Sequence, residues 1–123
     1  MIFVVLPAFN EDKKIGRVIR GLFEHGFKNI VVVDDGSVDN TSNIAKEAGA
    51  TVLQHVVNRG QGAALQTGNE YSLKQGAKVI VHFDADGQFN PADITSGLAC
   101  LEDQKVDIVF GSRFLDERSK IPF

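Results

Sequence analysis

Short apolar runs alternate with helical patterns along the whole chain, and this alternation restricts the fold more than any other feature. Runs of this length without polar alternation are typical of strands that are buried on both faces of a parallel sheet. Strands that alternate with helices indicate crossover connections. The sequence therefore predicts an α/β fold, with a mostly parallel sheet and helices on both faces. The runs cover residues 2–6, 29–33, 51–54, 79–83 and 106–110.

The helical pattern is clearest between the first two runs. Gly26 follows that pattern at the position where the end of a helix favours a left-handed residue. Further helices are predicted over about residues 41–48, 63–74 and 90–101. The first helix has apolar residues at the spacing of one helix face, namely Ile15, Val18, Ile19, Leu22 and Phe23.

Composition places the chain among globular proteins. Its 123 residues suit one domain, 1–123, and it is 43% hydrophobic and 24% charged. The net charge of −3 argues against nucleic-acid binding, which depends on a basic surface. No apolar stretch approaches the length of a membrane span, so we expect a soluble chain. Cys100 is the single cysteine, which excludes an internal disulfide and fits a reducing compartment such as the cytoplasm.

Clusters of polar residues follow every predicted strand. In a parallel sheet the loops after the strands gather at one edge, which is where α/β proteins bind ligands. We therefore expect these clusters to form one site. In chain order they are Pro7, Asn10 and Glu11; Asp34, Asp35, Gly36, Ser37 and Asp39; Arg59, Gly60 and Gly62; Asp84, Asp86 and Gln88; and Ser112 and Arg113.

The fourth cluster predicts a metal site. Asp84, Asp86 and Gln88 stand at alternate positions after an apolar run, so in extended backbone their side chains point the same way. Two carboxylates that converge on one point repel each other unless a cation lies between them. Oxygen ligands suit Mg²⁺ or Mn²⁺, which usually bridge to substrate phosphates. The alternative is a solvated turn at the end of the strand.

The other clusters also have structural alternatives. Asp34 and Asp35 suit a turn, although adjacent carboxylates after an apolar strand are costly unless something binds them. Glu11 suits the first turn of a helix, and Arg113 suits a solvated surface. The Gly-x-Gly pattern before the third helix is a weak signal by itself. The three histidines share no metal-binding spacing and are interpreted as structural: His25, His55 and His82.

The clusters together resemble family 2 glycosyltransferases with the GT-A fold, a Rossmann-like nucleotide-diphospho-sugar transferase fold. Within that family they are most similar to the polyprenyl-phosphate (dolichol-phosphate) sugar transferases. The similar segments keep the order and spacing of the family and cover almost the whole chain. They are PAFNE (7–11), VDDGSVDNT (33–41), NRGQGAA (58–64), DADGQ (84–88) and GSRF (111–114).

The resemblance implies a nucleotide pocket. Asp35 would contact the base or the ribose, with Asp34 supporting it. The segment from Arg59 to Gly62 would pack near the base. The full set of implied nucleotide-binding residues is Pro7, Ala8, Glu11, Asp34, Asp35, Arg59, Gly62 and Asp84.

The resemblance also implies a metal-dependent reaction. Asp84, Asp86 and Gln88 would hold Mg²⁺ or Mn²⁺ on the diphosphate of the donor. Asp86 and Arg113 would be catalytic, with Arg113 approaching the diphosphate. A divalent cation would stabilise the negative charge that gathers on the leaving group as the sugar departs.

The activity that the resemblance implies is transfer of a hexose from a UDP- or GDP-sugar to a polyprenyl phosphate or another hydroxyl acceptor. The enzyme would work in the cytoplasm or on the cytoplasmic face of the membrane. Family members continue beyond the fifth strand and carry the acceptor site there. We therefore expect this chain to be the N-terminal nucleotide-binding part, with the C-terminal part missing, inactive alone and prone to self-association through exposed apolar surface.

Three other functions compete with this one. The chain could be a nucleotide-sugar-binding module without turnover. Haloacid-dehalogenase-like phosphatases also place Asp-x-Asp after an apolar strand, but after the first strand and not the fourth. Sugar-1-phosphate nucleotidyltransferases carry a glycine-rich loop after the first strand, and this chain has none there.

For Asp35 the sequence predicts a role in ligand binding and not in stability. The cost of desolvating a carboxylate in a crevice would be offset only when a ligand donates hydrogen bonds to it. Replacing Asp35 by Asn is therefore expected to weaken nucleotide binding and to leave the melting temperature unchanged or raised.

Overall fold

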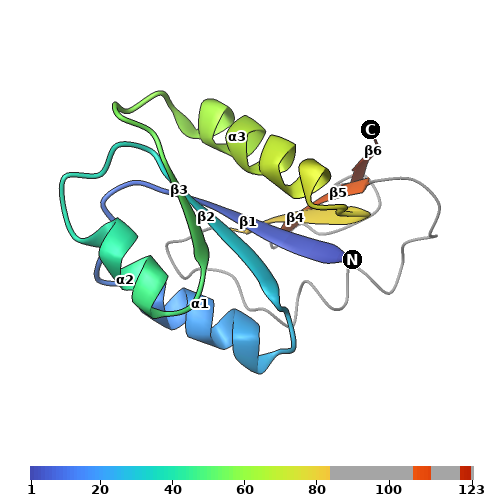
Figure 1. Cartoon of the computed structure of the whole chain (residues 1–123), viewed down its shortest axis with the longest axis horizontal. Helices are drawn as coiled ribbons and strands as arrows, with labels where there is room; N and C mark the ends of the chain where they lie inside the picture. The colour runs from blue at the N-terminus through green and yellow to red at the C-terminus, as the bar shows by residue number, and fades with distance from the viewer. Residues whose placement is uncertain (84–106, 112–119, 123) are drawn as a thin grey trace.

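The computed structural model describes residues 1–83, 107–111 and 120–122, which form a six-stranded sheet covered by helices (Figure 1). The strands are β1 Ile2–Ala8, β2 Asn29–Asp34, β3 Thr51–Gln54, β4 Val79–Phe83, β5 Asp107–Gly111 and β6 Lys120–Pro122. The helices are α1 Ile15–Glu24, α2 Thr41–Glu47 and α3 Gln61–Lys74.

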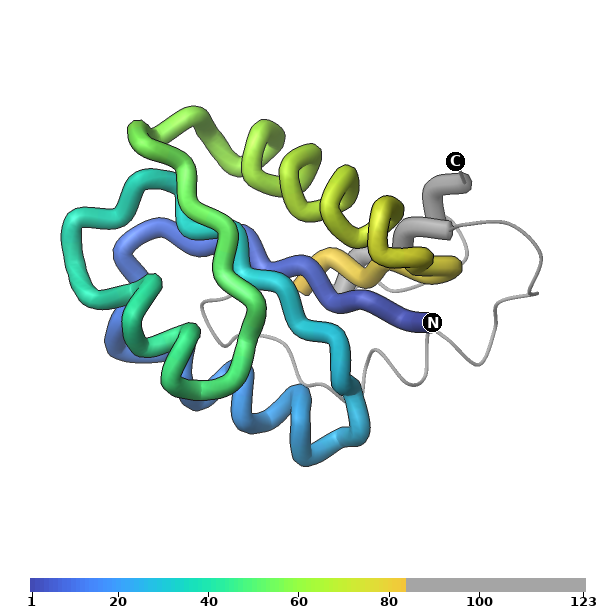
Figure 2. The backbone as a smooth tube through the Cα atoms, viewed as in Figure 1, coloured from blue at the N-terminus to red at the C-terminus, as the bar shows by residue number. Residues whose placement is uncertain are grey.

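The strand order of the sheet is β3-β2-β1-β4-β5-β6. The first five strands in this order pair in parallel, and β6 pairs antiparallel with β5. The chain moves outward from β1 to β2 and β3, and α3 then carries it back to β4 on the other side of β1 (Figure 2). The predicted α/β fold with a mostly parallel sheet is confirmed. The antiparallel β6 is a strand that the sequence analysis did not predict.

Helices cover both faces of the sheet, as predicted, with α1 and α2 on one face and α3 on the other (Figure 1). Alternate strand residues separate accordingly into two cores, because successive side chains of a strand point to opposite faces. Val4 and Leu6 of β1 belong to the core that includes α1. Phe3 and Val5 belong to the core that includes Ala64 of α3.

The predicted boundaries match β3 and β4 and differ most at β1. This strand continues through Pro7, which the sequence analysis assigned to a loop, and Pro7 pairs with Val33 of β2. The pairing of β1 with β4 ends at Val5. Proline has no N–H to donate, but a strand tolerates it where no partner strand needs that donor. The predicted helix over 90–101 lies outside the described residues.

His82 of β4 is buried beneath α3. Its Nε2 lies 2.8 Å from Oδ1 of Asn69, and the residue is 8% exposed. Burial lowers the pKa of His82 to about 4, so the imidazole is neutral at pH 7 and connects the strand to the helix. This arrangement supports the structural interpretation of His82.

The helices in the described part of the chain give no sign of a membrane span. None of them combines the length and the apolar character that crossing a bilayer requires.

Gly68 sets the distance between α3 and the sheet. A Cβ at this position would lie 2.4 Å from Cγ1 of Val5 and 3.2 Å from Cγ2 of Val33. Both valines are fully buried in the sheet, and β-branched side chains have little rotameric freedom to move away. The absence of a side chain at Gly68 therefore lets α3 pack directly on β1 and β2.

We predict that Gly68→Ala lowers the free energy of unfolding by about 1–3 kcal/mol, because the added methyl group overpacks this contact. Urea denaturation measures the change. Gly62→Ala in the same helix is the matched control, since a Cβ there meets nothing within 4 Å. Alanine favours a helix over glycine, so the control is expected to be neutral or slightly stabilising. Equal losses in both variants would contradict the proposed close contact.

Candidate functional site

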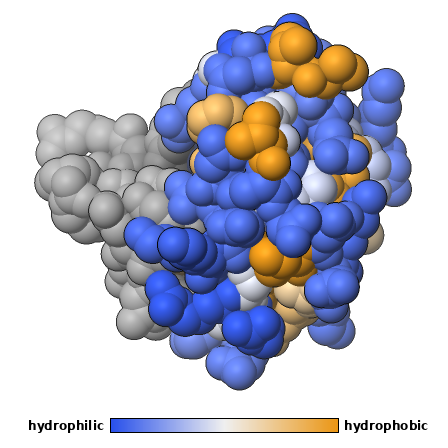
Figure 3. Space-filling view, turned by 90° about the vertical axis from the view of Figure 1, so that its left-hand side faces the viewer, coloured by the Kyte–Doolittle hydropathy of each residue, from blue (hydrophilic) through white to orange (hydrophobic). Residues whose placement is uncertain are grey.

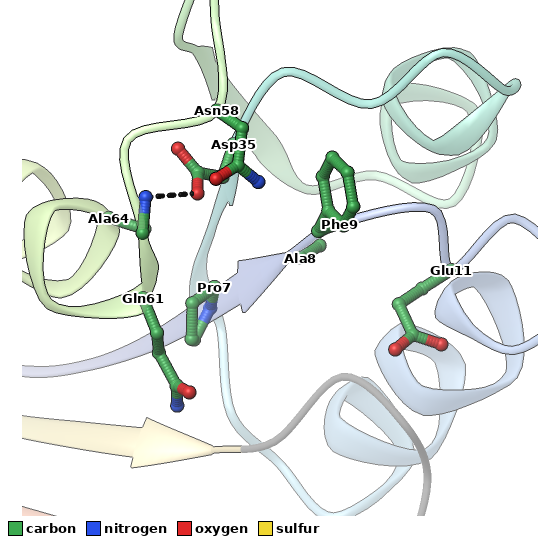
Figure 4. Close-up of a pocket in the computed structure, with 9 residues that line it drawn as sticks. Pro7, Ala8, Phe9, Glu11, Asp35, Asn58, Gln61 and Ala64 are labelled. Atoms are coloured by element: carbon green, nitrogen blue, oxygen red, sulfur yellow. Dashed lines mark hydrogen bonds between the residues drawn. The ribbon is translucent and has the colours of Figure 1, made fainter.

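A pocket of about 340 Å³ opens at the carboxyl ends of β1 and β2 (Figure 4). It lies beside the point where the strand order reverses, since β2 and β4 flank β1 on opposite sides. Open α/β sheets bind ligands at such points. The residues that line the pocket are Pro7, Ala8, Phe9, Glu11, Asp35, Asn58, Gly60, Gln61 and Ala64.

The β1–α1 loop forms one wall of this pocket and is fixed by side chains of the β2–α2 loop and of the first residue of α2. The N–H groups of three consecutive residues each donate to one of these side chains. Asn10 donates to Oγ of Ser37 at 2.8 Å, and Glu11 donates to Oγ1 of Thr41 at 2.9 Å. The third bond runs from Asp12 to Oδ2 of Asp39 at 3.3 Å. The loop is therefore held without any ligand.

Asn10 has a left-handed backbone, with φ of 55°. Asparagine tolerates this conformation better than most residues because its short polar side chain bonds locally. Its Oδ1 accepts a hydrogen bond from the N–H of Val38 at 3.0 Å. The β1–α1 and β2–α2 loops are thus tied together from both sides.

Asp34 is buried and has a structural role within the chain. It is 2% exposed, and Oδ1 accepts a hydrogen bond from the N–H of Ser37 at 2.9 Å. The hydroxyl of Ser42 donates to Oδ2. Asp34 is not among the residues that line the pocket, so it shapes the turn beneath Asp35.

The carboxylate of Asp35 binds the loop that precedes α3. Oδ1 accepts a hydrogen bond from the N–H of Arg59 at 2.8 Å, and Oδ2 accepts one from the N–H of Gly60 at 2.8 Å. Figure 4 draws the second bond as a dashed line. Burial by itself would raise the pKa of Asp35, but the bonds from Arg59, the His55 side chain and Gly60 outweigh it and lower the pKa.

These bonds correct one expectation. The sequence analysis expected the desolvation of Asp35 to be offset only by a ligand, with no loss of stability in an Asn variant. The first part of that expectation is wrong, because the chain itself supplies the donors, and the stability of the Asn variant stays a prediction. Asp35 both lines the pocket and holds the loop at Arg59 and Gly60 in place.

Gly36 allows the two loops beside Asp35 to meet. Its φ is +80°, and a Cβ there would lie 2.6 Å from the backbone nitrogen of Asn58 and 2.7 Å from the carbonyl carbon of Val57. Backbone atoms cannot move aside as a flexible side chain could. A residue other than glycine would therefore push the loop before α3 away from Asp35.

His55 joins the same network, which the sequence analysis did not anticipate. Its Nδ1 lies 2.7 Å from Oδ1 of Asp35, and its Nε2 lies 2.9 Å from Oγ1 of Thr67 in α3. The sequence did contain a signal, since His55 is the first residue after β3 and so lies at the ligand-binding edge of the sheet. The spacing of the three histidines along the chain carries no information about this contact.

The pocket brings together part of the predicted site. Pro7, Ala8, Glu11 and Asp35 line it, whereas Asp34, Arg59 and Gly62 do not. The lining residues that the sequence analysis did not assign to the nucleotide site individually are Phe9, Asn58, Gly60, Gln61 and Ala64. The predicted residues that lie outside the described part of the chain are Asp84, Asp86, Gln88 and Arg113.

The position of Glu11 excludes its structural alternative. The helix α1 begins at Ile15 and has no acidic residue in its first turn. Glu11 lies before the helix and lines the pocket instead.

The described lining of the pocket includes two carboxylate side chains, Glu11 and Asp35, and no lysine or arginine. An anionic ligand would therefore need positive charge from elsewhere. Within residues 1–83, 107–111 and 120–122, no three His, Cys, Asp or Glu side chains form a metal-binding group. The chain continues from the end of β4 at Phe83 directly into Asp84, the first of the predicted metal ligands.

The face that carries these loops is mainly hydrophilic, with separate hydrophobic spots on the described surface (Figure 3). Val38 is 90% exposed, Val56 is 98% exposed and Val57 is 63% exposed. Self-association through apolar surface stays a prediction.

Comparison with known proteins identifies relatives over nearly the whole chain. The family model described as Glycosyl transferase family 2 matches residues 3–121. An uncharacterized protein of Methanocaldococcus jannaschii, MJ1222, is 49% identical over 116 residues, which covers 94% of this chain and 48% of that protein. The UDP-N-acetylglucosamine–dolichyl-phosphate N-acetylglucosaminyltransferase of Methanococcus voltae is 35% identical, with 92% of this chain and 52% of that protein covered. The chain spans about half the length of these curated relatives.

Comparison with solved structures identifies proteins with a similar fold. The glucosyl-3-phosphoglycerate synthase from Mycobacterium tuberculosis in complex with Mn²⁺, uridine-diphosphate and glucosyl-3-phosphoglycerate has a TM-score of 0.67 and 27% identity, and the match covers 80% of this chain and 38% of that one. The same enzyme with Mg²⁺ and uridine-diphosphate has a TM-score of 0.66 and 26% identity over the same shares of the two chains. These similarities confirm the predicted GT-A fold class.

We predict that Asp35→Asn lowers the free energy of unfolding by about 1–3 kcal/mol at pH 7. The carboxylate accepts a hydrogen bond at each oxygen, whereas the amide of Asn would place its own N–H₂ group against one of these donors. A carboxyl whose pKa is lowered by folding stabilises the protein above its ordinary pKa of about 3.9, and this stabilisation is lost as the pH falls through the lowered value. The difference between wild type and variant should therefore shrink in strong acid. Urea denaturation of both proteins, from pH 7 down into strong acid, measures this difference in the free energy of unfolding.

Glu47→Gln is the control for this prediction, since it removes the charge of an exposed carboxylate on α2. The control should stay close to wild type at every pH. An Asp35→Asn variant as stable as wild type at pH 7 would show that the loop before α3 does not depend on this carboxylate.

Proposed function

The chain belongs to glycosyltransferase family 2, and on that premise we propose that its pocket binds the nucleoside of a nucleotide-diphosphate sugar, whose sugar is then transferred to an acceptor. The observation that carries the proposal is the buried, ionised Asp35 in the wall of a pocket beside the strand-order reversal. A carboxylate there can accept hydrogen bonds from a base or a ribose. Pro7, Ala8 and Glu11 supply the opposite part of the lining.

The donor in this proposal is a UDP- or GDP-hexose. The pocket volume of about 340 Å³ is at the low end of the range for small-molecule sites, which suits the nucleoside portion of such a donor. Gly60, Gln61 and Asn58 would lie beside the base. Arg59 and Asp34 would act indirectly, since the N–H of Arg59 donates to Asp35 and Asp34 accepts a bond from the N–H of Ser37 in the turn that follows Asp35. Gly62 would contribute to nucleotide binding through its place in the first turn of α3, next to Gln61 in the pocket lining.

The acceptor in this proposal is a polyprenyl phosphate or another hydroxyl compound. The Methanococcus voltae relative is named for transfer to dolichyl phosphate. The enzyme would work in the cytoplasm or on the cytoplasmic face of a membrane. We propose residues 1–123 as a single nucleotide-sugar-binding domain within a longer transferase.

A divalent cation completes the proposal. The relative from Mycobacterium tuberculosis has been crystallised with Mn²⁺ or Mg²⁺ and uridine-diphosphate. The carboxylates in the described lining and the lack of lysine or arginine there also favour a cation beside an anionic diphosphate. Asp84, Asp86 and Gln88 would hold the ion, which when bound stabilises negative charge on the leaving diphosphate. Asp86 and Arg113 would be the catalytic residues, with Arg113 directed to the diphosphate.

One alternative function is a nucleotide-sugar-binding unit without turnover. It agrees equally well with the pocket, because the role proposed for the described residues is nucleoside binding and does not include acceptor binding. A release assay separates the two functions: UDP or GDP is measured with and without a polyprenyl phosphate. Acceptor-dependent release supports transfer, and donor binding without release supports the alternative. The family match gives no support to a haloacid-dehalogenase-like phosphatase.

We predict that binding of UDP or GDP depends on the metal. Isothermal titration in Mn²⁺ should give an affinity at least tenfold higher than titration in EDTA, since the ion offsets repulsion between the diphosphate and the carboxylates by roughly 1.4 kcal/mol or more. Asp86→Ala should remove most of this difference.

Glu47→Ala is the control variant, because it removes an acidic side chain that is exposed on α2 and does not line the pocket. It should keep the full response to Mn²⁺. Equal affinities of the wild-type chain in Mn²⁺ and in EDTA would exclude a metal on the diphosphate.

A further inference from the structure

Three side chains form a continuous hydrogen-bonded chain from the pocket wall into α3. They are Asp35 at the end of β2, His55 at the end of β3 and Thr67 in α3. The side chains of His55 and Asp35 are 6% and 5% exposed. Thr67 lies about one helical turn beyond Ala64, which lines the pocket. A buried polar chain of this kind is costly unless each member is satisfied.

The partners determine which nitrogen of His55 carries a proton. Nδ1 lies 2.7 Å from a carboxylate oxygen, and a carboxylate only accepts hydrogen bonds, so Nδ1 must donate. In the neutral ring Nε2 then accepts a bond from the hydroxyl of Thr67 at 2.9 Å. The N–H of His55 also donates to the carbonyl oxygen of Asp34 at 2.8 Å. His55 is therefore held by hydrogen bonds at its backbone N–H and at both ring nitrogens.

The two oxygens of Asp35 are occupied unequally. Oδ1 accepts bonds from His55 and from the N–H of Arg59, whereas among the described residues Oδ2 accepts one bond, from the N–H of Gly60. A carboxylate oxygen has room for about two donors. Oδ2 therefore has room for one more donor, and Asp35 lines the pocket in which a ligand would supply it.

We propose that His55 and Thr67 are positioning residues of the nucleotide pocket, which hold Asp35 so that Oδ2 accepts a hydrogen bond from an N–H or O–H of the nucleoside. The inference rests on the proposed function. His55 occupies Oδ1 and thereby limits rotation of the carboxylate, and Thr67 limits rotation of the imidazole. The orientation of Asp35 is thus set before a nucleotide arrives, which lowers the entropic cost of binding.

The test compares affinities for a ligand with a nucleoside and a ligand without one. UDP, GDP and inorganic pyrophosphate are titrated calorimetrically in Mn²⁺ into the 123-residue chain and its variants. His55→Ala should weaken binding of the preferred nucleotide roughly tenfold, as expected for loss of a hydrogen bond to a charged group. Pyrophosphate lacks the nucleoside, so its affinity should not change.

Two conservative variants separate positioning from a general effect on folding. Asn places its Nδ2 where His carries Nδ1, so His55→Asn should recover most of the affinity that His55→Ala loses. Thr67→Val keeps the shape of the side chain without its hydroxyl and should cause a smaller loss in the same direction. Urea denaturation of each variant measures stability independently of affinity.

Matched controls are available outside the network. His25 lies at the end of α1 and contacts the carbonyl oxygen of Gly21, and Thr51 is exposed at the start of β3. His25→Ala and Thr51→Val should bind nucleotide as the wild type does.

The proposal is overturned if His55→Ala and Thr67→Val bind the nucleotide as tightly as wild type. It is also overturned if His55→Asn is as weak as His55→Ala, or if pyrophosphate binding falls as much as nucleotide binding. Failure of the wild-type chain to bind either nucleotide is a different result, since it overturns the proposed function itself and this inference with it.

Discussion

The N–H groups of Arg59 and Gly60 donate to the two oxygens of Asp35 at 2.8 Å each, and the position of the loop before α3 depends on this pair of bonds. Asp35 follows the last residue of β2, so a carboxylate anchored on the sheet fixes a segment that has no strand partner of its own. The contact between Gly36 and the backbone of Asn58 works in the same direction. This wall of the pocket is therefore held by the residues that follow β2 in the chain.

The wall of the pocket that the β1–α1 loop forms is also fixed by hydrogen bonds between backbone N–H groups and side chains. Backbone N–H groups that no strand or helix satisfies must find other acceptors when they are removed from water. In the β1–α1 loop these acceptors include the side chains of Ser37 in the β2–α2 loop and of Thr41, the first residue of α2. A pocket whose walls are fixed in this way needs little reordering when a ligand binds, which favours affinity.

The acidic character of this pocket links the described residues to those that follow β4. Glu11 and Asp35 give the described lining negative charge, and a nucleotide diphosphate carries more. Such a pairing is unfavourable unless a cation lies between the groups. The Asp-x-Asp sequence that follows β4 is the part of the chain that we propose holds this cation, and β4 is the strand next to β1. The neutral His82 adds no positive charge at pH 7.

The sequence by itself determined the order of the elements from β1 to β5, the mostly parallel sheet with helices on both faces, and the edge of the sheet where the pocket lies. These features follow from the pattern of apolar residues within each segment, which predicts a strand or a helix without reference to the rest of the chain. Only the tertiary structure decided that Pro7 continues a strand, that Asp35 holds a loop as well as lining the pocket, and that His55 reaches Asp35 and Thr67. Such contacts join residues far apart in the chain, and their geometry depends on how strands and helices pack together, which periodicity along the sequence does not encode.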